Sequence, residues 1–237
     1  AHLMAEYFNP VIQELHDLPV PVVAAVNGVC AGAGVSIALA ADIDETPHPG
    51  EHPGAMTCRL AEEKARAIAL RLGDVTADTL IVASDTTVAL NDEIYGKPID
   101  AADAKRMLKD LRSGPHQVFS AVSVLQLPGE RQATRINTTN VFMRNYSDEE
   151  IDTYIATGDP LDKAGAYGIQ AREFNCVEHL QGCFASVMGL PLADLSELLG
   201  EFGYQVTADI ASVCRLVNNF QCCAPEPSHS VNIELDS

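Results

Sequence analysis

The chain has 237 residues, of which 47% are hydrophobic, so it is long and apolar enough to bury a globular core. Its 33 Asp and Glu against 15 Lys and Arg give a formal net charge of −18, which repels nucleic acid backbones and anionic lipid surfaces. We therefore expect no polymeric nucleic acid and no membrane among the partners. A small anionic nucleotide is still compatible with this charge, provided that lysines converge locally and a divalent cation screens the rest.

Cysteine and histidine usage argues against a disulfide framework and a zinc site. Seven cysteines, an odd number without a CxxC pair, are typical of reduced thiols in a cytoplasmic chain. His48 and His52 are four apart, but Pro47, Pro49 and Pro53 surround them, so they are expected in a loop and not on one helical face. The opening AHLMAEYFNP has no basic region, so no signal peptide is predicted.

The N-terminal segment predicts a helix over Met4–Leu15, a strand over Pro21–Val26, a glycine-rich turn and a second helix over Gly34–Ala41. The uncharged run Pro19–Ala41 is long enough to cross a bilayer. Its apolar part is interrupted by Asn27 and glycines, which favours a strand, a turn and a buried helix over a membrane span.

The next elements predict a buried face and an antiparallel strand pair. A helix is expected over Thr57–Leu72 with Lys64 on its apolar side, where it is a better candidate for reaching a phosphate than Lys105 or Lys109. Further along, the pattern predicts a helix over Ala101–Leu111, strands over Val118–Leu127 and Ala133–Met143, a helix over Glu149–Thr157 capped by Ser147, and a last helical face through Ile210, Val213, Cys214 and Val217.

The stretch from Leu80 to Pro98 combines an acid with a lysine. Leu80–Ala83 is apolar and β-leaning, so Asp85 and Thr86 are expected near a strand's carboxyl end, where open α/β sheets bind ligands. After a polar turn, Gly96-Lys97-Pro98 constrains the backbone around a cation suited to a phosphate group. We therefore expect the acid and the lysine to face one cleft.

Six strings occur in one order along the chain: DIDETPHPGE from Asp42, RLAEEKARA from Arg59, ASDTTVALNDEIYGKP from Ala83, DAKRMLKDLRSGPHQV from Asp103, LDKAGAYGIQ from Leu161 and VMGLPL from Val187. Together they resemble the Maf family of nucleotide pyrophosphatases. The resemblance implies an α/β fold with a mixed sheet flanked by helices. It also implies hydrolysis of nucleoside triphosphates to a monophosphate and pyrophosphate with a divalent cation, Mg²⁺, and a homodimer.

The resemblance makes Asp85 the proton-accepting base of an A-D-T motif, which this chain writes as Ser84-Asp85-Thr86. Such hydrolysis needs a base for water, a divalent cation and fixed positive charge on the leaving pyrophosphate. We expect Asp85 and Glu45 to hold the metal. The alternatives are an Asp closing a turn at a strand end and a Glu in a solvated loop.

Five residues are predicted to bind the substrate: Lys64, Lys97 and Lys163 at the phosphates, and Thr86 and Gln170 at the base. The resemblance assigns Thr86 and Gln170 to substrate choice, and the AYGIQ form is similar to the branch that acts on dTTP and UTP. Ordinary surface lysines and a structural amide are the alternatives.

Residues 1–41 resemble a different family, the crotonase or enoyl-CoA hydratase/isomerase group, through YFNPVIQELHDLPVPVVAAVNGVCAGAGVSIALAADI. Hydratases of that family place a catalytic Glu just after the AGAG turn, where this chain has Ser36, so acyl-CoA chemistry is not expected. The segment stands where the Maf family has a strand and a SASPRR-like loop that grips the triphosphate.

Three parts are therefore predicted: a crotonase-like, foreign βα segment over 1–41, a Maf-like pyrophosphatase domain over 42–203 without its usual first strand and phosphate loop, and an unassigned tail over 204–237. We expect this loss to weaken activity. The alternative from another class is a catalytically inactive Maf-like binding or interaction module, and a joined reading frame would also explain two families in one chain.

Overall fold

The computed structural model describes residues 15, 18–20, 22–26, 37–40, 43–75, 78–129, 131–171 and 173–217. Its centre is a seven-stranded sheet with the order β2-β1-β3-β5-β6-β7, in which β4 pairs with β3 beside this path. The strands are β1 (Val22–Val26), β2 (Ile37–Ala40), β3 (Thr79–Leu90), β4 (Glu93–Tyr95), β5 (His116–Leu127), β6 (Arg131–Met143) and β7 (Val177–Gln181). β2, β1 and β3 run parallel and the other pairs are antiparallel, so the expected mixed sheet is confirmed.

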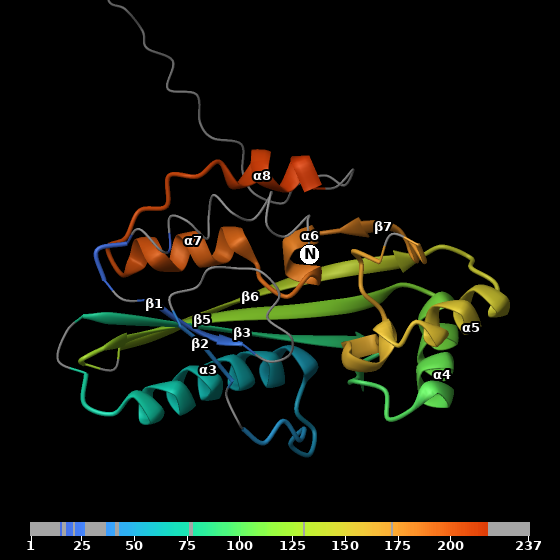
Figure 1. Ribbon diagram of the computed structural model, residues 1–237, viewed down its shortest axis with the longest axis horizontal. Helices are drawn as coiled ribbons and strands as arrows, with labels where there is room; N and C mark the ends of the chain where they lie inside the picture. Colours follow the sequence, from blue (N-terminus) through green and yellow to red (C-terminus); the bar gives the residue numbers. More distant parts are fainter. Residues whose placement is uncertain are drawn as a thin grey trace, which may run out of the picture.

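Helices lie on both faces of the sheet and at one of its ends (Figure 1). They are α3 (Pro53–Leu72), α4 (Ala101–Arg112), α5 (Asp148–Ala156), α6 (Phe184–Val187), α7 (Leu192–Glu201) and α8 (Ile210–Val217), with short 3-10 turns η1 (Asp159–Asp162) and η2 (Ala164–Ala166). In Figure 1, α3 runs beneath the sheet, α6 and α7 lie above it, and α4 and α5 stand at the right-hand end. The expected α/β fold is confirmed.

Alternation along β3 divides its side chains between two cores. Ile81 and Ala83 pack with the apolar side of α3, whereas Leu80 and Val82 pack with α7. Because successive side chains on a strand point to opposite faces, odd-numbered positions of β3 face α3 and even-numbered positions face α7. The same rule assigns the polar residues further along β3 to one face or the other.

Helix α3 begins within a run of prolines and ends at a glycine. His52 caps its start, since the Nδ1 atom accepts a hydrogen bond of 3.1 Å from the Gly54 N–H, and Pro53 occupies the first turn, where its missing N–H costs no helical bond. Gly73 ends the helix with a φ of 69°. The helix starts four residues before the predicted Thr57, because prolines that indicate a loop also suit a first helical turn.

The N-terminal prediction is confirmed in one strand and wrong in one helix. The strand expected over Pro21–Val26 is β1, but residues within the expected helix Gly34–Ala41 form β2, which pairs in parallel with β1. A short apolar run fits either structure, and here pairing with β1 decides. Most of the helix expected over Met4–Leu15 and the whole glycine-rich turn lie outside the described residues.

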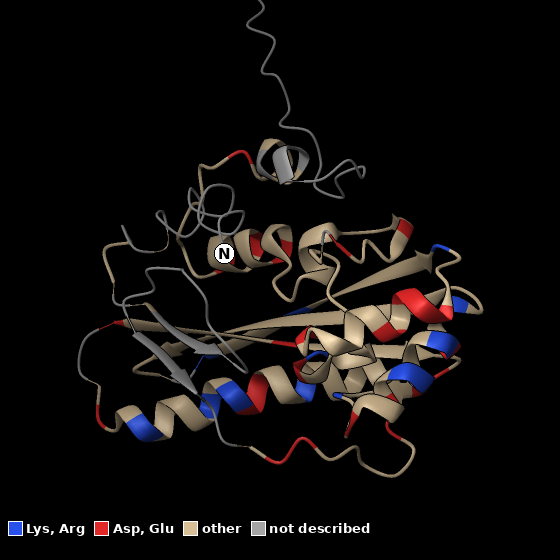
Figure 2. Cartoon of the chain, turned by 45° about the vertical axis from the view of Figure 1, so that its right-hand side comes forward, with Lys and Arg blue, Asp and Glu red and all other residues tan. Residues whose placement is uncertain are grey.

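The remaining predicted elements are confirmed to within two residues at each end. Ser147 caps α5 as expected, and Glu150 completes a capping box with it. Figure 2 shows basic segments of α4 beside acidic segments of α5. Lys105 pairs with Asp152 and Lys109 with Asp148, so these two lysines stabilise a helix–helix contact.

No helix in the described part of the chain is long and apolar enough to cross a membrane. The run Pro19–Ala41 contributes the two short strands β1 and β2 instead.

Candidate active site

The central acid lies in the middle of a strand. The prediction that Asp85 lies near the carboxyl end of its strand is wrong, because β3 continues to Leu90 and its ladder with β5 includes Asp85 opposite Ala121. The other edge of β3 is interrupted at this level. β1 pairs with β3 only as far as Ala83 and β4 starts at Val88, so the described strands leave four positions, 84–87, open on that side. We call these four positions the β3 notch.

A buried lysine connects two carboxylates beside the notch. Lys64 has a side chain with 0% exposure, and its Nζ lies 3.0 Å from Glu45 Oε1 and forms a short hydrogen bond with Asp85 Oδ1. A buried ammonium is stable only with such partners, which fixes all three side chains. The structure therefore brings together the predicted base, the second predicted metal ligand and one predicted phosphate cation on the α3 face.

Arg59 holds the loop that carries Glu45. Its Nε and Nη2 bind the two carboxylate oxygens of Glu51 at 2.7 and 2.8 Å, and Nη2 also donates to the Thr46 carbonyl at 3.3 Å. The Arg59 hydrogen bonds lower the pKa of Glu51 to about 2, so this carboxylate stays ionised. No role was predicted for Arg59 from the sequence, although it is the first residue of the RLAEEK string.

The acid–base properties of Asp85 are set by opposing effects. Burial raises its pKa above the ordinary value, the Lys64 ammonium opposes this shift, and the Glu45 carboxylate adds to it. Lys97 also lowers the pKa of Asp85 through its charge. A carboxylate with a raised pKa is a stronger base than an exposed aspartate and is suited to accepting a proton from water.

The donor set fits a divalent cation. The carboxylates of Glu45 and Asp85 lie close together, because both contact the Lys64 ammonium. Carboxylate oxygens are hard donors, which are the ligands that Mg²⁺ prefers. Within the described residues no group of three or more His, Cys, Asp or Glu could hold a metal ion, so the substrate and water would have to supply the remaining ligands. Two protein carboxylates completed by substrate phosphates and water is the usual arrangement for Mg²⁺.

The two glycine loops meet beside the sheet. Gly165, in η2, donates its N–H to the Gly96 carbonyl at 3.1 Å, next to the exposed Lys97. Gly165 has a φ of 69°, and a Cβ there would lie 3.0 Å from Val88 Cγ1. Glycine is thus required where the 163–170 loop contacts β3.

Thr86 points away from Asp85. Its Oγ1 lies 2.7 Å from Ser120 Oγ, which in turn contacts the Ser186 carbonyl of α6, so Thr86 lies on the α7 face of the sheet. The acid and this hydroxyl are adjacent in sequence but on opposite faces. One ligand can contact both side chains only by passing around the edge of β3 at the notch, where no described strand pairs with β3.

The remaining predicted contacts lie in the 163–170 loop. Lys163 Nζ bonds to the Asp159 carbonyl, Asp159 Oδ1 and Asp162 Oδ1 at 2.7 to 2.9 Å, so its charge is matched by acids of its own loop. Gln170 is exposed, and Gly168 lies between it and Lys163, since a Cβ on Gly168 would meet Lys163 Cε at 3.1 Å and Gln170 Cδ at 3.5 Å.

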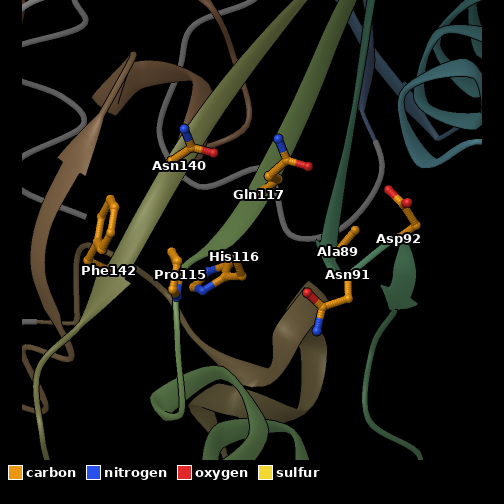
Figure 3. A pocket seen from close by; sticks show the side chains of 8 residues that line it. All are labelled: Ala89, Asn91, Asp92, Pro115, His116, Gln117, Asn140 and Phe142. Carbon is orange, nitrogen blue, oxygen red and sulfur yellow. The ribbon is translucent and has the colours of Figure 1, made fainter.

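A pocket of about 320 Å³ opens where β3 ends and β5 begins (Figure 3). Gln117 and Asn140, which are register partners on β5 and β6, line it together with Asn91 and Phe142. It contains none of the predicted site residues.

Comparison with known proteins decides the family. A family model described as Maf-like protein matches residues 31–202. The chain belongs to the Maf family. The match begins inside the segment that we assigned to another family, and a model described as enoyl-CoA hydratase/isomerase matches residues 1–45 of this Maf-family chain.

Several bacterial relatives named dTTP/UTP pyrophosphatase are similar to this Maf-family chain. The Chromobacterium violaceum protein is 44% identical over 169 residues, which cover 70% of this chain and 83% of the relative. The Hahella chejuensis protein is 40% identical over 180 residues, covering 76% and 88%. The Dictyoglomus turgidum protein is 49% identical over 129 residues, covering 54% and 67%.

Proposed function

We propose that this chain hydrolyses nucleoside triphosphates, with dTTP and UTP as preferred substrates, to a nucleoside monophosphate and pyrophosphate. The observation that carries the proposal is the arrangement of Asp85 and Glu45 around the buried Lys64 beside the β3 notch, in a member of the Maf family. The names of the relatives support the choice of dTTP and UTP.

Asp85 acts as the base in this reaction. It accepts a proton from a water molecule as the water oxygen bonds to the α-phosphorus, and the bond from that phosphorus to the oxygen bridging to the β-phosphate breaks. The bridging oxygen leaves with the β- and γ-phosphates as pyrophosphate. Mg²⁺ held by Asp85 and Glu45 supplies Lewis-acid stabilisation of the phosphate charge when it is bound.

The lysines stabilise the leaving pyrophosphate. Lys64 is positioned by its two carboxylate contacts, and Lys97 lies close enough to Asp85 for its charge to affect that group. Lys163 is held by partly exposed and therefore weak ion pairs with Asp159 and Asp162, so a phosphate can compete for its ammonium group.

In this proposal the nucleobase of the substrate lies on the α7 side of the notch, where Thr86 and Gln170 can hydrogen-bond to its edge. The cytoplasmic location, the homodimer and the lack of nucleic acid or membrane partners stay predictions.

The deciding experiment incubates purified chain with Mg²⁺ and a panel of dTTP, UTP, dCTP, CTP, dATP and GTP, and measures both pyrophosphate and the monophosphate. Equal amounts of the two products from dTTP and UTP, abolished by EDTA, support the proposal. Tight binding of these nucleotides without products would instead establish the inactive binding module.

A further inference from the structure

Two hydroxyls on neighbouring strands form a hydrogen-bonded chain that ends on a backbone carbonyl. Thr86 Oγ1 on β3 lies 2.7 Å from Ser120 Oγ on β5, and Ser120 Oγ lies 2.6 Å from the carbonyl oxygen of Ser186. Thr86 and Ser120 are register partners in the β3–β5 ladder. Ser120 is fully buried, whereas Thr86 is partly exposed at the notch.

The carbonyl fixes the direction of both hydrogen bonds. A carbonyl oxygen carries no hydrogen, so Ser120 must donate its single hydroxyl hydrogen to Ser186. The Ser120 oxygen can then only accept in its contact with Thr86, and Thr86 must donate. Because Thr86 uses its one hydrogen inward, its hydroxyl can act only as an acceptor toward a ligand.

Space for a ligand atom exists next to this acceptor. Gly189 has a φ of 107°, and a Cβ built on it would lie 3.6 Å from Thr86 Oγ1 and within 4 Å of no other heavy atom in the described structure. Ser84 Oγ lies 2.7 Å from the Gly189 carbonyl oxygen and 2.8 Å from the Ala121 carbonyl oxygen, so its one hydrogen is shared between them and holds Gly189 close to β3. The missing side chain thus leaves an open position facing the Thr86 oxygen.

We infer that Ser120 is a positioning residue for base choice, which fixes Thr86 as an acceptor and so favours a base that carries a ring N–H donor. Uracil and thymine have this donor at N3, whereas the N3 of cytosine is an acceptor and would face the Thr86 lone pairs without a hydrogen. The inference rests on the proposed function for its ligand and goes beyond it by naming the residue that sets the hydrogen-bond direction.

The test compares kcat/KM for UTP and CTP in the Ser120→Ala variant with Mg²⁺ present. Without Ser120 the Thr86 hydrogen can turn outward, so Thr86 can donate to cytosine N3 as well as accept from uracil N3–H. We expect the UTP-to-CTP ratio to fall about tenfold, mainly through a gain for CTP. A structural defect would lower both values by one factor, and that result overturns the inference.

Further variants separate positioning from packing. Ser123→Ala removes another buried hydroxyl of β5, on the α3 face, and should leave the ratio unchanged. Thr86→Ser keeps the acceptor and should keep the ratio, whereas Thr86→Val should lower it through a loss for UTP. An unchanged ratio in Thr86→Val would refute the acceptor on which the inference depends, whether or not Ser120→Ala folds. Adding Ser120→Ala to Thr86→Val should change nothing more, since Ser120 acts through Thr86. A further fall in the double variant contradicts the inference.

Binding of the non-hydrolysable α,β-methylene analogues of UTP and CTP distinguishes the two proposals. A parent chain that prefers the uridine analogue but releases no pyrophosphate refutes the hydrolysis and keeps this inference. A parent chain that hydrolyses UTP and CTP at equal rates keeps the hydrolysis and refutes this inference. A chain that binds neither analogue refutes both.

Discussion

Asp85 combines burial with a direct contact to a buried ammonium, and the consequences of this arrangement can be tested at the level of one carboxylate. Asp85→Asn removes the proton acceptor but keeps the size and one hydrogen-bonding oxygen. If Asp85 activates water, we expect kcat to fall about 10²-fold or more with the fold unchanged by circular dichroism. Asp152→Asn, an exposed acid on α5, is the matched control and should retain full activity. Equal kcat values for Asp85→Asn and the parent would remove Asp85 from the mechanism.

The pH dependence of the reaction reports the same group. Asp85 must be ionised to accept a proton, and burial raises its pKa above the ordinary value of 3.8. Activity should therefore be present at neutral pH and be lost as the pH falls through this raised pKa. The measurement is kcat/KM for dTTP against pH, which reports the free enzyme. An acid limb at or below 3.8 would mean that Lys64 outweighs burial.

Gln170 tests the base-reading prediction independently of Ser120. Its amide can pair with a pyrimidine edge, and Gln170→Ala should therefore flatten the order of kcat/KM among dTTP, UTP and dCTP. The nucleotide panel measures this order in parent and variant. An unchanged order would show that the exposed Gln170 does not contact the base.

The sequence indicated some of these residues better than others. Lys64 was predictable because it falls on the apolar side of a periodic helix, and the structure buries it there. That Asp85 and Thr86 point to opposite faces follows from the strand period once the strand is extended through them. Ser120 carried a weaker signal, because it is one of several polar residues along β5, and its hydrogen-bond direction depends on the Ser186 carbonyl 66 residues away, which no local pattern shows.

At the scale of elements, the contact between η2 and the loop after β4 connects the two glycine motifs. Gly165→Ala places a side chain 3.0 Å from Val88 at a positive φ, which costs about 1–2 kcal/mol of stability for the left-handed backbone alone. Because Gly165 also holds the Gly96 carbonyl, we expect Lys97 to shift and KM for dTTP to rise.

The control for this variant is Gly158→Ala. Gly158 has a φ of 78° with no atom within 4 Å of a built Cβ in the described structure, so it shares the backbone strain without the contact to β3. Thermal unfolding should show a loss of stability in both variants, and steady-state kinetics should show a higher KM only in Gly165→Ala. A higher KM in both variants would mean that backbone strain, and not the contact of η2 with β3 and the Gly96 carbonyl, raises the KM.

Element boundaries were predictable where one local signal dominated. The helix end at Leu72, followed by Gly73, and the cap at Ser147 are as expected, since a positive φ and a capping box depend on neighbouring residues. The strand β2 could not be predicted, because a four-residue apolar run becomes a strand only when β1 provides a partner. β3 extends past Ala83 for the same reason, since its ladder with β5 continues through the polar residues.

At the scale of the whole molecule, residues 1–41 contain no Lys or Arg, yet they contribute β1 and β2 to the sheet next to β3. We predict that replacing them with a family-like strand ending in SASPRR raises kcat/KM for dTTP by orders of magnitude, because each added charge-assisted phosphate contact contributes about 1.5–3 kcal/mol. The same graft with both arginines changed to Gln is the control and should gain little. A parent chain that is already fast, with no gain from the graft, would refute the predicted defect.

The β3 notch also has a consequence for self-association. A free strand edge is a template on which another chain can add a strand and start aggregation. Among the described strands, only positions 84–87 lack a partner on that edge, because β1 pairs with β3 up to Ala83 and β4 pairs with it from Val88. Four positions between two occupied stretches are fewer than the roughly six or seven residues of a segment that typically builds amyloid-like sheets. The sheet can therefore open an edge for a small ligand while offering too little backbone for amyloid-like growth.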